Sequence, residues 1–282
     1  DKPDRDSFQV AAYLQKQGYK IIPVNPNAVE ILGEKSYSDL NAIQRTPAKG
    51  GKMSEVTVKW WGHAFFLISD NKIKIALDPF NNSVGYPMPD VSADLLLMSH
   101  GHFDHSNASA VKGNPTQITG YGKKSAKGID FMGVKTFHDE NQGKDRGENT
   151  VFVWEMEGIR FAHCGDLGHL LTEQNLREIG SVDVVMIPVG GFYTIDSKVA
   201  TQNMEKLKPK VVIPMHYKQP FMGDDFPIDK VEVFLQGKKN VEKVENLVKS
   251  KKLSQEPEDL EALKTAIGKH FLKNFAPSDK TI

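Results

Sequence analysis

Cysteine, charge imbalance and long apolar runs are all scarce in this chain, and each scarcity excludes a class of protein. The 282 residues include one cysteine, Cys164, which excludes an internal disulfide framework. Lys+Arg and Asp+Glu both number 36, and a formal net charge of +0 gives no support for a nucleic-acid partner held by bulk charge. No apolar run is long enough to span a bilayer, so we expect no membrane partner and a cytoplasmic location.

Breaker-rich segments divide the sequence into zones. Residues 1–45 contain a helical pattern at Phe8–Leu14 and a strand pattern at Tyr19–Val24, and residues 46–54 form a linker rich in glycine and lysine. From residue 55 to 245, short apolar runs alternate with turns. We expect strands at 56–60, 65–68, 73–77, 95–98, 134–137, 151–154, 159–162, 184–187 and 211–213, with helices at about 172–179 and 197–207.

The C-terminal residues 246–282 carry an apolar stripe at helical spacing. The stripe consists of Leu260, Leu263, Ile267 and Phe271, which predicts a helical tail. We expect this stripe to pack on the main body of the protein, and a contact between copies in a homo-oligomer is the alternative.

A histidine-rich run carries the strongest sign of chemistry. His100, His102, Asp104 and His105 form the pattern H-x-H-x-D-H directly after the apolar run Leu95–Met98. Side chains two positions apart in an extended segment point to the same side. His100 and His102 can therefore hold one ion, while Asp104 and His105 turn toward a second. Imidazole and carboxylate ligands together suit zinc, iron or manganese.

Three further residues able to bind a metal each follow an apolar strand pattern. They are His138, Asp166 and His216. Singly, each is more typical of an ordinary surface or buried polar residue. Together with the histidine-rich run, they supply the donor chemistry of two metal sites.

Residues 55 to about 235 resemble the metallo-β-lactamase superfamily, and within it the stand-alone metal-dependent hydrolases related to ascorbate-6-phosphate lactonase. The matching motifs are Gly62–Phe66, Leu77–Phe80, His100–His105, Gly165–Asp166, Ile187–Thr194 and Ile213–Tyr217. The resemblance implies an α/β protein with an αββα sandwich, in which two mixed sheets lie face to face, helices lie outside, and the metals lie at one edge between the sheets.

The resemblance also implies a role for each ligand position. His100, His102 and His138 match the ligands of a first metal, and Asp104, His105 and His216 match those of a second. Asp166 matches a carboxylate that bridges both metals, and Asp78 matches an acid that supports the ligand loop from behind. We expect two divalent ions, Zn²⁺ by preference, with Mn²⁺ or Fe²⁺ as alternatives.

The implied activity is that of a binuclear metal-dependent hydrolase. A metal-bridging hydroxide would attack a small-molecule ester, lactone or phosphoester. Asp104, His63 and Tyr193 are the candidate catalytic residues: Asp104 as a proton acceptor, His63 at the metal rim, and Tyr193 as a donor to a developing oxyanion. The alternatives are a non-hydrolytic metal redox enzyme of the same fold and a CoA-linked binding module.

Other residues near the ligand positions have simpler interpretations. Cys164 is expected to be a buried structural thiol, since Asp104 already fills the position that a cysteine ligand takes in some relatives. His163 is expected to support the site or the core. For His169, a surface position and contact with the substrate both remain open.

The N-terminal residues 2–40 resemble a fragment of a bacterial CoA-binding Rossmann-like domain, through Phe8–Leu14, Gly18–Asn27 and Ile31–Tyr37. One helix and one strand cannot bury a core of their own, so we do not expect this fragment to bind CoA. Two interpretations of residues 1–52 stay open: a docking element, or the remnant of an upstream gene.

Overall fold

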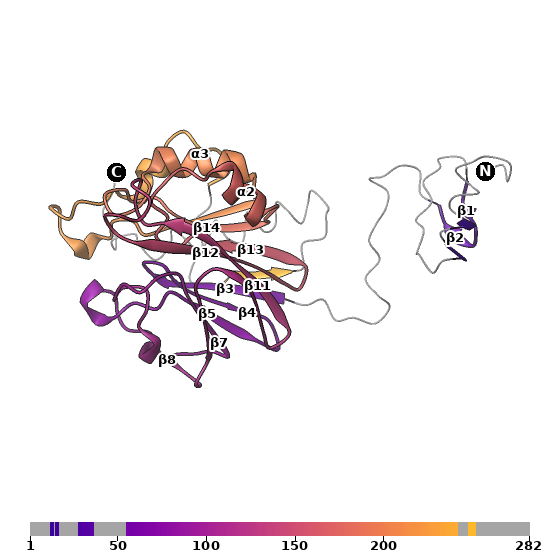
Figure 1. Cartoon of the computed structure of the whole chain (residues 1–282), viewed down its shortest axis with the longest axis horizontal. Coiled ribbons are helices and arrows are strands. Elements are labelled where there is room, and N and C mark those ends of the chain that lie inside the picture. The colour runs from indigo at the N-terminus through magenta and orange to yellow at the C-terminus, as the bar shows by residue number, and fades with distance from the viewer. Residues whose placement is uncertain (1–11, 14, 17–27, 37–54, 242–247, 252–282) are drawn as a thin grey trace, which may run out of the picture. The chain divides into compact units, whose positions relative to one another are not determined.

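The computed structural model describes residues 12–13, 15–16, 28–36, 55–241 and 248–251 (Figure 1). The chain divides into two compact units, Asp1–Lys52 and Met53–Ile282. In the first unit, β1 (Glu30–Ile31) and β2 (Glu34–Lys35) form a short antiparallel hairpin. The strand expected at residues 19–24 lies outside the described residues, as does most of the helix expected at residues 8–14, of which positions 12 and 13 are helical.

Two six-stranded mixed sheets build the second unit (Figure 1). The first sheet has the strand order β16 (Val248–Lys251), β3 (Glu55–Gly62), β4 (Phe65–Ser69), β5 (Lys74–Leu77), β7 (Leu95–Met98) and β9 (Thr116–Thr119). The second has the order β10 (Gly122–Ala126), β11 (Ile129–Phe137), β12 (Glu148–Met156), β13 (Ile159–His163), β14 (Val184–Pro188) and β15 (Val211–Met215). Each sheet changes from antiparallel to parallel pairing along its width, at β5–β7 in the first and at β13–β14 in the second.

The apolar run of β7 shows how both faces of a strand become buried. Leu95 and Leu97 pack into the core between the two sheets, whereas Leu96 and Met98 pack into a second cluster on the outer face. The alternation follows from the two-residue period of a strand. A strand covered on both faces is apolar throughout, which is why this segment reads as an uninterrupted apolar run.

Different outer layers cover the two sheets. The helices α2 (Glu173–Ile179) and α3 (Ser197–Leu207) lie over the second sheet, and the short α4 (Val231–Leu235) contacts α3 (Figure 1). The outer cluster on the first sheet lies instead among loops, the 3-10 helices Asn82–Val84 and Ala108–Ala110, and the strand pair β6 (Val91–Ser92) and β8 (Val111–Lys112). The expected sandwich is confirmed, with loops in place of α-helices over the first sheet in the described part of the chain.

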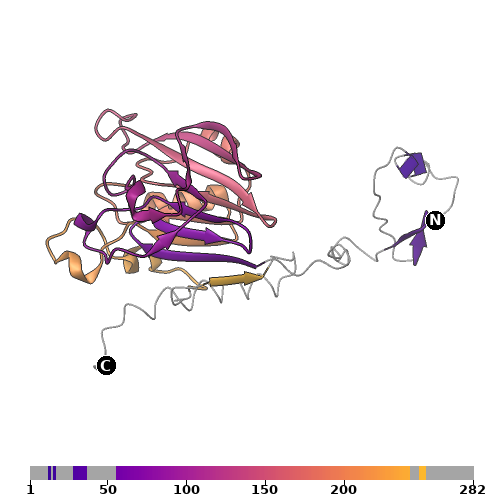
Figure 2. The same ribbon diagram turned by 90° about the horizontal axis from the view of Figure 1, so that it is seen from below.

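The strand β16 extends the first sheet beyond the expected domain end near residue 245. Its residues pair antiparallel with β3, Val248 opposite Val58, and Figure 2 shows it as the yellow-orange arrow along that edge. The segment 248–251 is therefore a strand where we expected a helical tail. The apolar stripe of residues 260–271 lies outside the described residues. Among the residues that are described, no helix is long and apolar enough to cross a membrane.

Candidate metal centre

Strand ends from both sheets gather the seven predicted ligands. The run His100–His105 follows β7 of the first sheet, while His138 follows β11, Asp166 lies three residues after β13, and His216 follows β15. The structure places these residues in overlapping groups whose donor atoms lie within 4.8 Å of one another. The groups are His100 with His102 and His138, His100 with His105 and Asp166, and His63 with Asp104, His105 and His216.

Asp166 lies between the two groups of histidines. Its Oδ1 is 3.1 Å from His105 Nε2, while its Oδ2 is 3.1 Å from His138 Nε2 and 3.4 Å from His216 Nε2. The carboxylate is almost fully buried, and its backbone N–H donates to Asn149 Oδ1 at 3.0 Å. One side chain therefore faces histidines from both predicted sites.

His100 Nε2, His105 Nε2 and Asp166 Oδ1 are buried and make no well-aligned hydrogen bond to another described residue, although His105 Nε2 and Asp166 Oδ1 lie 3.1 Å apart. The other ring nitrogen of each histidine has a partner, since His100 Nδ1 is 2.9 Å from Ser99 Oγ and His105 Nδ1 is 2.9 Å from Asp78 Oδ2. Buried polar atoms are rarely left unpaired, and the donor atoms of these three residues lie within 4.8 Å of one another, as the ligands of a cation do. The residues present therefore fit a bound metal.

Asp78 supports the ligand loop, as the resemblance implies. Its carboxylate accepts hydrogen bonds from Ser99 N at 2.7 Å and Ser99 Oγ at 2.6 Å, in addition to the contact with His105. Although burial raises the pKa of Asp78, the nearby His163 and His105 outweigh burial and lower it. Asp78 has a backbone φ of 44°, a left-handed conformation that is costly outside glycine, so the surrounding contacts must hold it there.

The electrostatics of the centre separate the histidines into two classes. Burial lowers the pKa of His63 to about 4 and that of His100 to about 3. Burial also disfavours the protonated forms of His105 and His138, but the negative charge of Asp166 outweighs burial and raises the pKa of both residues. In turn, these neighbours hold the pKa of Asp166 well below its usual range despite burial. Without metal, Asp166 therefore favours the protonated forms of His105 and His138.

His63 lies against the second group of ligands. Its Nε2 is 3.2 Å from Asp104 Oδ2, and its ring centroid is 4.2 Å from that of His216. Its carbonyl accepts hydrogen bonds from Trp60 Nε1 at 3.1 Å and from His216 N at 3.2 Å. The backbone φ of His63 is 52°, next to a register shift between Trp60 and Gly62. The strained turn thus directs this ring toward Asp104.

Tyr193 lies on the loop after β14 and is 36% exposed. Its ring centroid is 4.7 Å from that of Phe192 and 6.2 Å from that of Phe226, and Arg146 Cζ lies 6.0 Å from the Tyr193 centroid. The structure thus places Tyr193 in an aromatic cluster outside the groups of ligand atoms.

Cys164 and His163 lie near the proposed ligands but have other roles. Burial raises the pKa of the Cys164 thiol to about 12, and Cys164 belongs to none of the ligand groups found in the described residues. His163 Nε2 donates to Ala64 O at 3.1 Å, and its Nδ1 accepts from Gly165 N at 3.2 Å, so the ring joins the two sheets.

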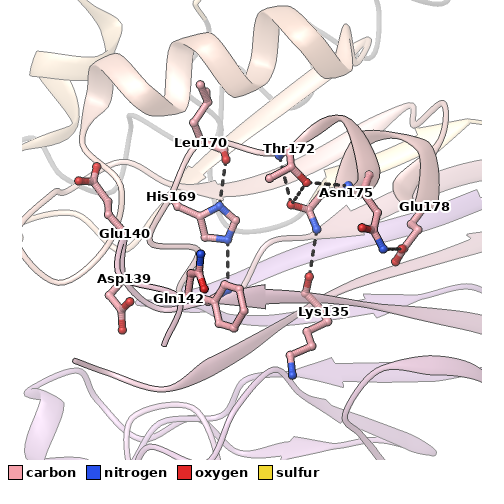
Figure 3. Close-up of a pocket in the computed structure, with 11 residues that line it drawn as sticks. Lys135, Asp139, Glu140, Gln142, His169, Leu170, Thr172, Asn175 and Glu178 are labelled. Atoms are coloured by element: carbon pink, nitrogen blue, oxygen red, sulfur yellow. Dashed lines mark hydrogen bonds between the residues drawn. The ribbon is translucent and has the colours of Figure 1, made fainter. Parts of the chain in front are cut away.

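His169 uses both of its ring nitrogens on the backbone. Nε2 accepts a hydrogen bond from Phe137 N at 3.1 Å, and Nδ1 donates to Leu170 O at 2.9 Å (Figure 3). It lines a cavity of about 610 Å³ between the end of β11 and α2. None of the seven predicted ligands lines that cavity. The structure therefore separates His169 from the metal centre.

Asn149 is a supporting residue that sequence reasoning missed. It is buried in β12, where its Oδ1 accepts from Asp166 N and its Nδ2 donates to Cys164 O at 2.9 Å and to Thr136 Oγ1 at 2.8 Å. Gly165 leaves the space for this contact, since a Cβ there would lie 2.4 Å from Asn149 Oδ1. Asn149 lies just before the apolar run Val151–Trp154, between the polar Glu148 and Thr150, so the sequence offered no signal that set it apart.

Comparison with known proteins identifies the family. Residues 57–216, more than half of the chain, match the family described as the beta-lactamase superfamily domain. The chain belongs to the metallo-β-lactamase superfamily. Residues 1–58 match the CoA binding domain, in agreement with the resemblance at the N-terminus.

Individual relatives agree with this assignment. The UPF0173 metal-dependent hydrolase of Thermococcus onnurineus is 30% identical over 190 residues, covering 57% of this chain and 84% of the relative, and that of Pyrococcus abyssi is 32% identical over 191 residues. A crystal structure from Thermotoga maritima, described as a candidate zinc-dependent hydrolase of the superfamily, is 40% identical with a TM-score of 0.59. The match covers 68% of this chain and 91% of that one. As a member of this superfamily, the protein is a metal-dependent hydrolase.

Proposed function

We propose that the protein is a binuclear hydrolase in which Asp166 joins two metal sites. His100, His102 and His138 would hold the first ion, and Asp104, His105 and His216 the second. The observation that carries the proposal is the position of the Asp166 carboxylate, one oxygen of which is 3.1 Å from His105 and the other 3.1 Å from His138. One carboxylate facing both sets of histidines is the arrangement that a shared ligand requires.

When bound, two divalent cations would supply an ionised water near neutral pH and polarise the carbonyl or phosphoryl oxygen of the substrate, since a Zn²⁺-bound water has a pKa of about 7. Among the chain's own residues, Asp104 would supply a negative charge beside the second ion. Although burial raises the pKa of Asp104, the hydrogen bond from His63 and the charge of His105 lower it well below its usual range. Asp104 is therefore ionised at neutral pH, which both a metal ligand and a proton acceptor require, but its lowered pKa makes it a weak base in the metal-free protein.

His63 and Tyr193 are the other proposed catalytic residues, and their surroundings suit different tasks. His63 donates from Nε2 to Asp104 Oδ2, so it orients the carboxylate that would accept the proton. The hydroxyl of Tyr193 is carried on the loop after β14 and would donate to an oxyanion that develops on the substrate.

Zinc is the proposed metal. The donor set contains five histidines and two carboxylates, and imidazole suits Zn²⁺ while Mn²⁺ and Fe²⁺ accept the same atoms. The relative from Thermotoga maritima is itself described as zinc-dependent. We propose residues 55–251 as the hydrolase domain and residues 1–45 as a partial CoA-binding-like fragment, joined by residues 46–54.

The proposed substrates are small esters, lactones or phosphoesters. The test is a screen of 4-nitrophenyl esters, γ- and δ-lactones and bis-4-nitrophenyl phosphate with zinc-reconstituted protein. His102→Ala is the matched control, because His102 is the most exposed of the proposed ligands and its loss should leave the fold intact. Hydrolysis that disappears in His102→Ala and after chelation supports the proposal. Oxygen consumption by an iron-loaded protein without hydrolysis of any of these compounds would overturn it.

A further inference from the structure

The loop that follows His138 is fixed by one buried carboxylate. Asp139 Oδ1 accepts hydrogen bonds from the backbone N–H groups of Asn141 and Gly143, both at 2.8 Å. Asp139 Oδ2 accepts from those of Asp145 at 3.1 Å and Arg146 at 2.8 Å. Asp139 is only 5% exposed. Four hydrogen bonds to one side chain hold this loop in a single conformation.

The same loop closes onto a proposed ligand. The backbone N–H of His138 donates to Gly147 O at 3.0 Å, which brings the end of the loop back beside His138. Arg146 is the residue before Gly147, so its backbone is held next to the first metal site.

The guanidinium of Arg146 is exposed and lies over Tyr193, with Cζ 6.0 Å from the ring centroid. Among the described residues, no carboxylate pairs with this guanidinium and no hydrogen bond from it is found. Two other basic side chains are paired, by contrast: Arg160 donates to Ile179 O at 3.0 Å, and Lys210 pairs with Asp183 at 2.9 Å. Arg146 therefore presents an uncompensated positive charge with five donors.

The loop that carries Tyr193 is held at both ends beside proposed ligands. Gly190, at the start of the loop, packs so closely on the segment after β15 that a Cβ would lie 2.2 Å from His216 O. At the other end, Ile195 N donates to Leu167 O at 2.9 Å, one residue after Asp166. Tyr193 is three residues from Gly190, which limits the separation of their Cα atoms to roughly 10 Å. The Arg146–Tyr193 pair thus joins the loop that follows His138 to a loop held beside His216 and Asp166.

We propose that Arg146 is a substrate-binding residue and that the substrate carries a carboxylate or phosphate group away from the bond that is cleaved. The inference rests on the proposed function of the metal centre. A planar guanidinium binds either oxyanion through two parallel hydrogen bonds. The Asp139 contacts fix the backbone that carries it, so less conformational freedom is lost on binding than for an arginine on a loose loop.

The experiment compares two substrates that differ only in a remote charge. Mono-4-nitrophenyl adipate carries a free carboxylate too distant to attack its own ester readily, and methyl 4-nitrophenyl adipate is its neutral counterpart with the same leaving group. The ratio of their kcat/KM values, the anion preference, is measured for the zinc-loaded wild type, Arg146→Ala, Arg146→Lys and Arg177→Ala. Arg177 is the matched control, since it is an exposed arginine in the last turn of α2.

We expect Arg146→Ala to lower the anion preference at least about tenfold, mainly by raising KM for the anionic ester, with Arg146→Lys in between. Arg177→Ala should match the wild type on both esters, and Arg146→Ala should lose less activity on the neutral ester than on the anionic one. An unchanged anion preference in Arg146→Ala would overturn the inference and leave Arg146 as a packing partner of Tyr193. A second pair of 4-nitrophenyl esters, made from 3-phosphonopropionate with a free and with an esterified phosphonate, is measured in the same way. The anion whose preference falls more in Arg146→Ala is the one that Arg146 recognises.

Failure of the proposed function remains distinguishable from failure of this inference. If the wild type hydrolyses none of these esters, the ester assignment fails. Calorimetric titration of adipate and of monomethyl adipate into the zinc-loaded wild type and Arg146→Ala then tests Arg146 alone. Tighter binding of adipate in the wild type only would support the inference, and equal binding in both proteins would contradict it.

Discussion

Asp78 Oδ2 lies 2.9 Å from His105 Nδ1, and both side chains are excluded from solvent. The carboxylate accepts the Nδ1 proton, which leaves Nε2, on the side of Asp166, as the atom that would bind a metal once the ion displaces its proton. This contact fixes the orientation of the ring and the nitrogen that faces the centre.

Removing this support should weaken metal binding without removing a ligand. We expect Asp78→Ala to lower affinity for the second ion about 10- to 100-fold, because His105 loses the acceptor that orients it. Competition with a chromophoric chelator measures the affinity. Asp90→Asn is the matched control, since the one side-chain contact of Asp90 within the described part of the chain is an exposed ion pair with Lys112. Equal affinities in Asp78→Ala and Asp90→Asn would show that Asp78 does not position His105.

Cys164 provides a test of the ligand set. Its thiol is fully buried, so Cys164→Ser should cost about 1–3 kcal/mol of unfolding free energy through burial of a hydroxyl, while metal content stays unchanged. Chemical denaturation and metal analysis of the same preparation give both quantities. Loss of one ion per chain in Cys164→Ser would mean that the thiol is a ligand.

The pKa shifts predict the pH dependence of metal loading. In the metal-free protein the pKa values of His105 and His138 are raised above the ordinary 6.5, so protons compete with the metal at these two positions even above that pH. His63 and His100 have lowered pKa values of about 4 and about 3 and are already neutral there. Metal uptake near pH 7 should therefore release protons, and activity should fall as pH drops below roughly 7.

Excess metal separates this competition from other causes of an acid limb. Mass action predicts that raising the zinc concentration displaces protons from His105 and His138 and moves the acid limb of the rate to lower pH. A pH indicator in weak buffer measures the protons released. An acid limb that does not respond to zinc, together with no proton release, would contradict this assignment.

The loop carrying Arg146 can be loosened without touching a proposed ligand. Asp139→Ala removes the acceptor of four backbone N–H groups, and we expect a loss of about 1–3 kcal/mol of unfolding free energy together with a weaker anion preference. Asp145→Ala is the control, because within the described residues Asp145 contributes only its backbone N–H to this network. Stability of Asp139→Ala equal to that of Asp145→Ala would show that the loop does not depend on Asp139.

The proposed ligand residues could be found in the sequence because they follow apolar strands. The strand before His100 is fully buried and those before His138 and His216 are largely so, and burial is what makes a strand visible in a sequence. The strands β9 and β10 were missed, since Thr116–Thr119 and Gly122–Ala126 are largely exposed and polar. Local pattern carries no signal for such edge strands.

Contacts between distant segments were also beyond the sequence. Asn149 meets Asp166 across 17 positions, and Arg146 reaches Tyr193 from another loop. His63 was singled out by its motif, but its contact with Asp104 depends on a strained turn 41 positions earlier in the chain. Such pairs depend on how the two sheets pack, and the spacing of apolar residues along the sequence does not predict them.

The number of metal ions per chain tests the central claim most directly. Inductively coupled plasma mass spectrometry of zinc-reconstituted protein should find about two ions per chain in the wild type. Asp166→Ala, which removes the carboxylate between His105 and His138, should retain fewer and bind each more weakly. A wild type that never exceeds one ion, or an Asp166→Ala variant that keeps two ions and the full rate, would contradict the binuclear centre.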